Sequence, residues 1–398
     1  MKRFLITFLI LAAIVNFCNA QPKLLPKPSG EFFVGVDYLC FTDTTRKELF
    51  DNNSEGYREI TVKAWYPTDT EPVTTAPYFY DADIIVKYFA FPEIYSEIIT
   101  NSSRGTPLSN KENKYPVVIF NHGFGEHFSQ NTILMEELAS NGYLVFSIAH
   151  HYECKFSFYP DGRLISIDMN SNRFKQIMQE QQKPGAIDLI FKMMGLDGID
   201  EQRQILIDQS NALPTLLKES PIHWANDISF FLDQLEMINN HNQLLKGKLD
   251  LKRIGVLGMS MGGMATNEIC ISDSRVQAGI NMDGGLTGSQ LDKRIQTPFM
   301  FLNGKRYLGY GKLFTKNIVK DGYSFSVRGA DHYNFTDYSI YKIQNLSFLM
   351  GTIEGNRIIL IMNDLVVAFF DKYLKQKENI DITDKAQNYP EIEIWTNL

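Results

Sequence analysis

The stretch RIGVLGMSMGGM, residues 253–264, places a serine in the pattern Gly-x-Ser-x-Gly. The apolar residues before the first glycine predict a strand, and a helix is expected from Met261. A serine on a tight strand-to-helix turn has a strained, exposed side chain, and the turn needs small residues two positions before and after it. Gly258 and Gly262 meet this need, so Ser260 is a candidate nucleophile. The alternative is an ordinary glycine-rich turn with a capping serine.

Strand and helix patterns alternate along most of the chain. Short runs rich in Val, Ile, Leu and Phe predict buried parallel strands, and an early alternating run predicts a half-exposed antiparallel strand. The expected strands are Arg58–Tyr66 (the alternating run), Pro116–Phe120, Leu144–Ile148, Arg253–Leu257, Val276–Met282, Pro298–Leu302 and Tyr323–Val327. The expected helices are Gln130–Asn141, one capped by Asn226 and running through Ile238, one from Met261, and Arg357–Leu374. This order predicts an α/β fold with a mostly parallel central sheet and helices on both faces.

Residues 21–398 contain no repeat, low-complexity tract or linker, so we expect a single catalytic domain. Residues 155–221 break the alternation and are expected to form an insertion over the carboxyl edge of the sheet, where open α/β sheets bind ligands. Its apolar side chains suit an acyl pocket, a lipid-facing lip or simply core; they include Phe156, Phe158, Tyr159, Phe191, Met193 and Met194. A transient contact with a lipid surface would need an amphipathic patch around Ala186–Met194.

The first twenty residues have the pattern of a cleaved signal peptide. Lys2 and Arg3 precede the apolar run Phe4–Val15, and Cys18-Asn19-Ala20 places small residues at the cleavage site. The apolar run is only about 12 residues long, whereas a membrane span needs roughly 20. We therefore expect cleavage before Gln21 and a periplasmic or extracellular protein.

Charge and cysteine usage exclude several classes of protein. The chain has 39 Lys and Arg against 46 Asp and Glu, and no basic run, so a nucleic-acid surface is not expected. Cleavage would leave Cys40, Cys154 and Cys270, an odd number without the spacing of a zinc or redox site. We expect buried thiols, at most one disulfide, and no metal.

A nucleophilic serine needs a base and an acid, and in α/β-hydrolases the chain order is serine, acid, histidine. Of the seven histidines, only His332 follows Ser260. His332 lies in a loop after the last expected parallel strand, from which its side chain could reach across the edge of the sheet. It is the candidate base, the alternative being an exposed loop histidine.

Several acidic residues follow the serine, and position separates them. The aspartates between Ser260 and His332 are Asp273, Asp283, Asp292, Asp321 and Asp331. Asp283 ends an expected strand and precedes two glycines, which favours it as the acid. Asn303 ends the next strand but is uncharged, and Asp331 adjoins the base in sequence, which usually points the two side chains apart.

The oxyanion of a tetrahedral intermediate needs backbone N–H donors from the residue after the nucleophile and from an early strand-to-helix loop. Met261 would supply the first, and Phe124, in the loop Asn121-His122-Gly123-Phe124-Gly125, the second. His150 and His151 follow a strand at the same edge and could line the pocket. Neighbouring strand residues point to opposite faces, which argues against joint metal binding.

Together these motifs resemble the platelet-activating-factor acetylhydrolase branch of the α/β-hydrolases, with its dienelactone-hydrolase-like bacterial relatives. The resemblance spans most of residues 21–398. It rests on Gly35 with Asp43 and Arg46, Arg58, Trp65-Tyr66-Pro67, His122-Gly123-Phe124, the turn at Ser260, Asp283, His332-Tyr333-Asn334-Phe335-Thr336-Asp337 and Ala368-Phe369-Phe370-Asp371-Lys372-Tyr373-Leu374.

The resemblance implies the α/β-hydrolase fold and a serine esterase that uses neither metal nor cofactor. It implies Ser260 as nucleophile, Asp283 as acid and His332 as base, with Phe124 and Met261 as oxyanion donors. The sequence departs from the family in two places. The animal lipase-like members have His before and Phe after the serine where this chain has Met, and residues 155–221 have no match.

These observations predict an exported ester hydrolase that works through an acyl-enzyme. The expected substrates are short-acyl esters, such as the sn-2 ester of platelet-activating-factor-like or oxidised phospholipids. An alternative is a general carboxylesterase acting on sugar, polymer or xenobiotic esters. A binding protein on an inactive hydrolase scaffold is a third hypothesis, which the complete set of serine, acid, histidine and glycine-rich loop opposes.

Overall fold

The computed structural model describes residues 23–50, 56–159, 161–181, 214–286, 290–305, 311 and 313–397. The expected signal peptide and the segment Ala186–Met194 lie outside the described residues, as do all of residues 182–213 of the expected insertion.

The described strands form one ten-stranded sheet and a short hairpin. The strands are β1 (Phe33–Lys47), β2 (Tyr57–Thr68), β3 (Ser102–Arg104), β4 (Tyr115–Asn121), β5 (Leu144–His150), β6 (Ser157–Phe158), β7 (Leu164–Ile165), β8 (Leu249–Met259), β9 (Val276–Met282), β10 (Phe299–Asn303), β11 (Gly322–Val327) and β12 (Ile392–Thr396). The order in the sheet is β12-β11-β10-β9-β8-β4-β5-β2-β1-β3. From β11 to β5 neighbouring strands are parallel. Three pairs toward the edges are antiparallel: β12 with β11, β2 with β5, and β1 with β2.

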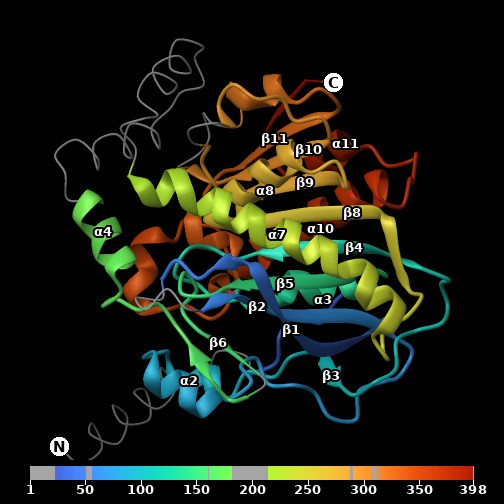
Figure 1. The fold of residues 1–398 in the computed structure, drawn as a ribbon. Helices are drawn as coiled ribbons and strands as arrows, with labels where there is room; N and C mark the ends of the chain where they lie inside the picture. The colour runs from blue at the N-terminus through green and yellow to red at the C-terminus, as the bar shows by residue number, and fades with distance from the viewer. Residues whose placement is uncertain are drawn as a thin grey trace, which may run out of the picture.

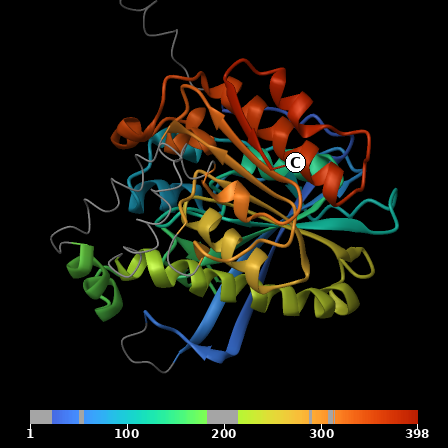
Figure 2. The same ribbon diagram turned by 90° about the horizontal axis from the view of Figure 1, so that it is seen from above.

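Helices cover both faces of this sheet (Figure 1). The described α-helices are α2 (Ala82–Tyr88), α3 (Thr132–Ser140), α4 (Asn172–Gln181), α7 (Thr215–His241), α8 (Met261–Ser272), α10 (Gly355–Tyr373) and α11 (Ile382–Gln387). Figure 2 shows α7 and α8 on one face and α3 and α10 on the other, and each pair belongs to a separate buried apolar cluster. The prediction of a mostly parallel sheet between two helical layers is confirmed.

The predicted parallel strands and the closing helix are present, with ends shifted by at most two residues except at β8, which begins four residues before the predicted Arg253. The helix before β8 differs, because α7 begins at Thr215 and Asn226 lies inside it, exposed, rather than at its cap. Apolar side chains at helical spacing, including Leu216 and Trp224, extend the buried face upstream of Asn226. Pro221, the last residue of the expected insertion, thus lies inside this helix.

The alternating strand β2 is not half-exposed, since nearly all of its side chains are buried. Its polar residues have partners inside the protein. The Thr61 hydroxyl lies 3.0 Å from Nε2 of His151, and Nζ of Lys63 donates to the Ser129 hydroxyl over 3.0 Å. The alternation in β2 therefore does not reflect one face in water and one in the core, because polar and apolar side chains are both buried and differ only in their partners. The long strand β1, which pairs with β2 along its length, had not been expected.

No helix among the described residues combines the length and the hydrophobicity that crossing a membrane requires.

Candidate active site

Ser260 lies on a sharp turn between β8 and α8, as the glycine pattern predicts. Its backbone has φ 57° and ψ −119°, a conformation that a residue with a side chain rarely adopts. A Cβ on Gly258 would lie 2.2 Å from the carbonyl group of Gly262, and one on Gly262 would lie 2.1 Å from the carbonyl oxygen of Asn121. Both glycines are therefore needed for the turn to close and for the β4 loop to pack against it.

Three side chains from separate loops meet at the carboxyl edge of the sheet. Nε2 of His332 lies 3.1 Å from Oγ of Ser260, and Nδ1 of His332 lies 2.6 Å from a carboxylate oxygen of Asp283. The Asp283 side chain is fully buried, whereas that of His332 is 16% exposed. This is the hydrogen-bonding order needed for a base that deprotonates a serine while an acid fixes the tautomer of the base.

Asp283 follows β9 and is itself held in place. Its φ of 49° turns the chain sharply, and its second carboxylate oxygen accepts a hydrogen bond from the Gly304 amide over 2.7 Å. The other candidates for the acid have different surroundings. Asp331 accepts from the backbone N–H of His332 and caps the short 3₁₀ turn that follows. No hydrogen bond within the described residues involves the Asn303 side chain.

The loop after β4 lies against the serine turn. A Cβ on Gly123 would lie 3.4 Å from Cβ of Ser260. The amide of Gly123 donates to Oε1 of Gln130, that of Gly125 to the carbonyl of Glu153, and that of Glu126 to the carbonyl of Gly123. Within the described structure, Phe124 thus has the one amide of residues 123–126 without a protein acceptor.

A buried ion network behind this loop escaped prediction from the sequence. Asp227 of α7 accepts two hydrogen bonds from Arg58 of β2, at 3.1 and 2.6 Å, and its Oδ2 lies 2.8 Å from Nδ1 of His150. Burial alone would raise the pKa of Asp227, but Arg58 and His150 outweigh it and hold the pKa well below its usual range. Arg58 also donates to Glu48. Only the resemblance had marked Arg58, and no local pattern marked Asp227.

The two adjacent histidines at the end of β5 are buried and face different partners. His150 stacks on Trp224 with ring centroids 4.0 Å apart, and its Nε2 lies 3.2 Å from the side-chain oxygen of Asn121. His151 contacts Thr61 on β2. Among the described residues, no three His, Cys, Asp or Glu side chains are grouped as a metal site would require.

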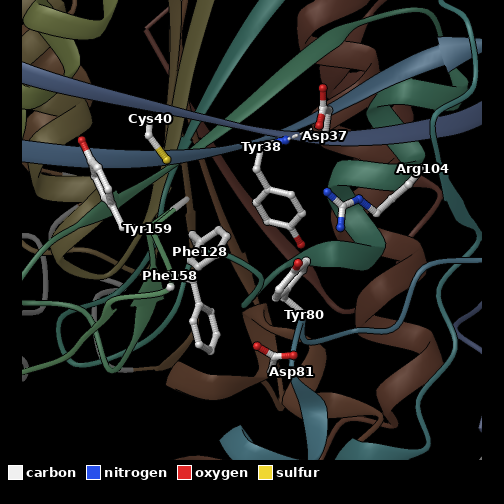
Figure 3. A pocket seen from close by; sticks show the side chains of 10 residues that line it. Asp37, Tyr38, Cys40, Tyr80, Asp81, Arg104, Phe128, Phe158 and Tyr159 are labelled. Atoms are coloured by element: carbon white, nitrogen blue, oxygen red, sulfur yellow. Dashed lines mark hydrogen bonds between the residues drawn. The ribbon is translucent and has the colours of Figure 1, made fainter.

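Apolar residues at the start of the insertion have two different environments. Phe156 is buried in an aromatic cluster with Phe79 and Phe91. Phe158 and Tyr159 instead line a cavity of about 280 Å³ (Figure 3). Its other described lining residues are Asp37, Tyr38, Cys40, Tyr80, Asp81, Arg104, Phe128 and Gly162.

The β1 residues of this cavity are separated in the sheet from β8, the strand that leads to Ser260, by β4, β5 and β2. The guanidinium of Arg104 lies 5.4 Å from the ring centroid of Tyr38 and 5.3 Å from that of Tyr80 (Figure 3). Cys40 faces the cavity and is only half-buried, whereas Cys154 and Cys270 are buried; all three are free thiols.

Comparison with known families agrees with this architecture. A model of the family "platelet-activating factor acetylhydrolase, isoform II" matches residues 17–165 and 226–393. The chain belongs to this family. Residues 166–225, which the match leaves out, include most of the stretch 155–221, for which the sequence showed no counterpart.

Individual relatives extend the comparison. The platelet-activating factor acetylhydrolase of the dog (Canis lupus familiaris) is 24% identical over 402 residues, covering 94% of this chain and 82% of the relative. That of the chicken (Gallus gallus) is 25% identical over 350 residues, covering 80% and 78%. A "probable 1-alkyl-2-acetylglycerophosphocholine esterase" of Arthroderma benhamiae is 23% identical over 309 residues, covering 71% of this chain and 65% of the relative.

A solved structure shares the fold. The ferulic acid esterase of Streptomyces cinnamoneus superposes with a TM-score of 0.70 and 21% identity, covering 94% of this chain and 99% of the other. The fold is therefore that of the α/β-hydrolases, and membership of the acetylhydrolase family identifies the chain as an ester hydrolase.

Proposed function

We propose that the protein is an exported serine esterase that works through an acyl-enzyme. The observation that carries this proposal is the continuous hydrogen-bonded series from Ser260 to His332 to Asp283, with spacings of 3.1 and 2.6 Å. The strained backbone of Ser260 adds support, since such strain is typical of nucleophiles on strand-to-helix turns.

Each residue of the proposed site has a defined role in the reaction. Ser260 Oγ attacks the ester carbonyl as Nε2 of His332 takes the hydroxyl proton, and Asp283 stabilises the resulting imidazolium. The amides of Phe124 and Met261 donate to the oxyanion. His332 then gives the proton to the departing alcohol, leaving an ester between Ser260 and the acyl group. Water, activated by His332, hydrolyses this ester.

The proposed substrates are short-acyl esters, such as the sn-2 ester of platelet-activating-factor-like or oxidised phospholipids. The family and the activities for which the relatives are named support this choice. We also propose export through cleavage before Gln21, and transient contact with a lipid surface. N-terminal sequencing of the processed protein should begin at Gln21; an intact Met1 would reject cleavage.

The chemical mechanism is tested by intact-mass analysis after treatment with a fluorophosphonate, alongside turnover of p-nitrophenyl acetate. We expect one adduct on the wild type, and neither adduct nor turnover in a Ser260→Ala variant of unchanged melting temperature. Turnover that survives in Ser260→Ala would reject the serine mechanism. A folded wild type without adduct or turnover would favour an inactive binding scaffold.

Substrate class needs a second experiment with the wild type. Initial rates on phosphatidylcholines whose sn-2 acyl chain varies in length should be highest for the shortest chains. A maximum on long chains would reject the short-acyl proposal. Hydrolysis of acetylated carbohydrate or feruloyl esters with none of phospholipid would select the general carboxylesterase instead.

A further inference from the structure

His122 is a fully buried histidine next to the proposed oxyanion loop, and the proposed reaction gives it no task. It follows β4 and directly precedes Gly123. Its Nδ1 lies 2.7 Å from the carbonyl oxygen of Gly123, and its Nε2 lies 3.2 Å from the backbone nitrogen of His150. Both ring nitrogens therefore have a backbone partner.

These partners determine the tautomer of the ring. The backbone nitrogen of His150 can only donate, so Nε2 of His122 must accept and carries no proton. The carbonyl of Gly123 can only accept, so Nδ1 must carry the proton and donate. Burial, followed by the neighbouring His150 ring, lowers the pKa of His122 to about 3, which keeps this neutral form at physiological pH.

The hydrogen bond from His122 fixes the direction of one peptide plane. The Gly123 carbonyl and the Phe124 N–H belong to the same trans peptide and point in opposite directions. Two donors, Nδ1 of His122 and the amide of Glu126, hold the carbonyl on one side. The Phe124 amide, which has no protein acceptor among the described residues, is thereby turned away from both donors. Gly123 itself lies against Cβ of Ser260.

We propose that His122 is the positioning residue of the oxyanion site: its Nδ1–H holds the 123–124 peptide so that the Phe124 amide faces the reacting carbonyl oxygen. This inference rests on the proposed serine mechanism. A hydrogen bond accepted by the carbonyl also polarises the peptide and strengthens its N–H as a donor.

His150 holds the His122 ring through a hydrogen bond to its Nε2. The backbone amide of His150 donates to His122, and its own ring stacks on Trp224 while its Nδ1 lies 2.8 Å from Oδ2 of Asp227. Asn121, which contacts the His150 ring, also donates from its side chain to the carbonyl of Leu257 at the end of β8. The oxyanion loop and the serine turn are thus tied to one buried cluster.

Two substitutions separate the two nitrogens of His122. The Nδ2 of Asn can take the place of Nδ1, so His122→Asn keeps a donor to Gly123 but loses the acceptor for His150. The longer side chain of Gln reaches the place of Nε2, so His122→Gln keeps that acceptor but loses the donor. A role in folding alone would make activity follow stability in both variants.

The test compares kcat, KM and melting temperature for the wild type, His122→Asn, His122→Gln and Ser260→Ala on p-nitrophenyl acetate. We expect His122→Gln to lose about 10²-fold in kcat with KM nearly unchanged, which is the size of effect of losing one oxyanion donor. His122→Asn should stay within about tenfold of the wild type although its melting temperature is the lower of the two. Inhibition by a trifluoromethyl ketone, a tetrahedral analogue, should weaken in parallel with kcat.

Equal kcat losses in the two histidine variants, or losses that follow the melting temperatures, would overturn the positioning role. Failure of the underlying mechanism has a different signature, since Ser260→Ala would then retain turnover whatever the histidine variants do. An unfolded His122→Asn would leave His122→Gln to decide. A folded His122→Gln with wild-type kcat and wild-type inhibition by the ketone would also overturn the proposal.

Discussion

Nε2 of His332 lies 3.1 Å from Oγ of Ser260 although 72 residues separate the two in sequence. The contact follows from the sheet, because β8, β9, β10 and β11 are parallel neighbours whose carboxyl ends lie at one edge. Ser260 follows β8, Asp283 follows β9, and His332 lies in the loop after β11. An unbroken parallel order at the centre of the sheet is therefore what brings the three side chains together.

Changing Asp283 to Asn should remove the carboxylate with little change of shape. The amide could donate to Nδ1 of His332, which would place the proton on Nε2 and prevent that nitrogen from accepting the serine proton. We expect kcat for p-nitrophenyl acetate to fall by about 10⁴-fold at an unchanged fold, measured by steady-state kinetics and circular dichroism.

Asp331→Asn is the matched control, since Asp331 adjoins His332 in sequence and its carboxylate caps a turn by accepting from the backbone N–H of His332. We expect little change in stability, because Asn caps a helical turn about as well as Asp, and a kcat within a few-fold of the wild type. A larger loss of kcat in Asp331→Asn than in Asp283→Asn would contradict the assignment of the acid.

Gly262 should tolerate no side chain. A Cβ there would lie 2.1 Å from the carbonyl oxygen of Asn121 and 2.6 Å from that of His122, both backbone atoms that cannot rotate away. Gly262→Ala should push the serine turn and the proposed oxyanion loop apart and lower kcat/KM by more than about 10²-fold. Gly105→Ala is the comparison, because a Cβ at Gly105 would meet nothing within 4 Å, although the φ of Gly105 is 73° and that of Gly262 is not positive. Unchanged turnover in Gly262→Ala would show that the turn can relax.

Much of this arrangement is encoded locally and was therefore readable from the sequence. The parallel strands are short apolar runs, and the turn at Ser260 needs glycines at fixed offsets. His332 is the candidate base because it is the only histidine after Ser260, and Asp283 is the candidate acid because it ends a strand. In the structure His332 lies within hydrogen-bonding distance of both Ser260 and Asp283.

Other features depend on contacts between distant segments and left no local pattern. Asp227 lies 169 residues from Arg58, and its position on α7 gives no sign of a charged partner. Asn226 has the residue type of a helix cap, yet the buried face of α7 continues upstream of it. Lys63 occupies a polar position of an alternating strand, where exposure to water was the natural prediction, but it packs against Trp65 and Ser129.

The network around Asp227 should be costly to break. Arg58 and Asp227 have side chains only 7% and 0% exposed, so removing the charge of Asp227 leaves the buried Arg58 with Glu48 as its remaining carboxylate partner. We expect Asp227→Asn to lower the free energy of unfolding by about 3–5 kcal/mol in urea titrations. Arg163→Met provides the contrast, because Arg163 is 49% exposed in its ion pair with Glu59 and such pairs contribute about 1 kcal/mol or less. Equal losses in the two variants would mean that the buried network adds nothing beyond a surface pair.

Lys63 should make stability depend on pH in the alkaline range. Burial, opposed by the nearby Glu136 and Asp337, lowers the pKa of Lys63 from 10.5 to about 7. Below pH 7 the side chain is protonated in both the folded and the unfolded protein. Between pH 7 and 10.5 the unfolded chain binds more protons, so the free energy of unfolding rises with pH, by at most about 1.4 kcal/mol per pH unit.

Lys63→Met isolates this contribution, because most other titrating groups are common to both proteins. Urea titrations of the two proteins at pH 6, 7, 8 and 9 should give a constant difference in unfolding free energy up to about pH 7. Above that pH the difference should shift steadily in favour of the wild type. A difference that stays constant to pH 9 would mean that Lys63 keeps its ordinary pKa, and that its contacts with Ser129 and Trp65 compensate fully for its burial.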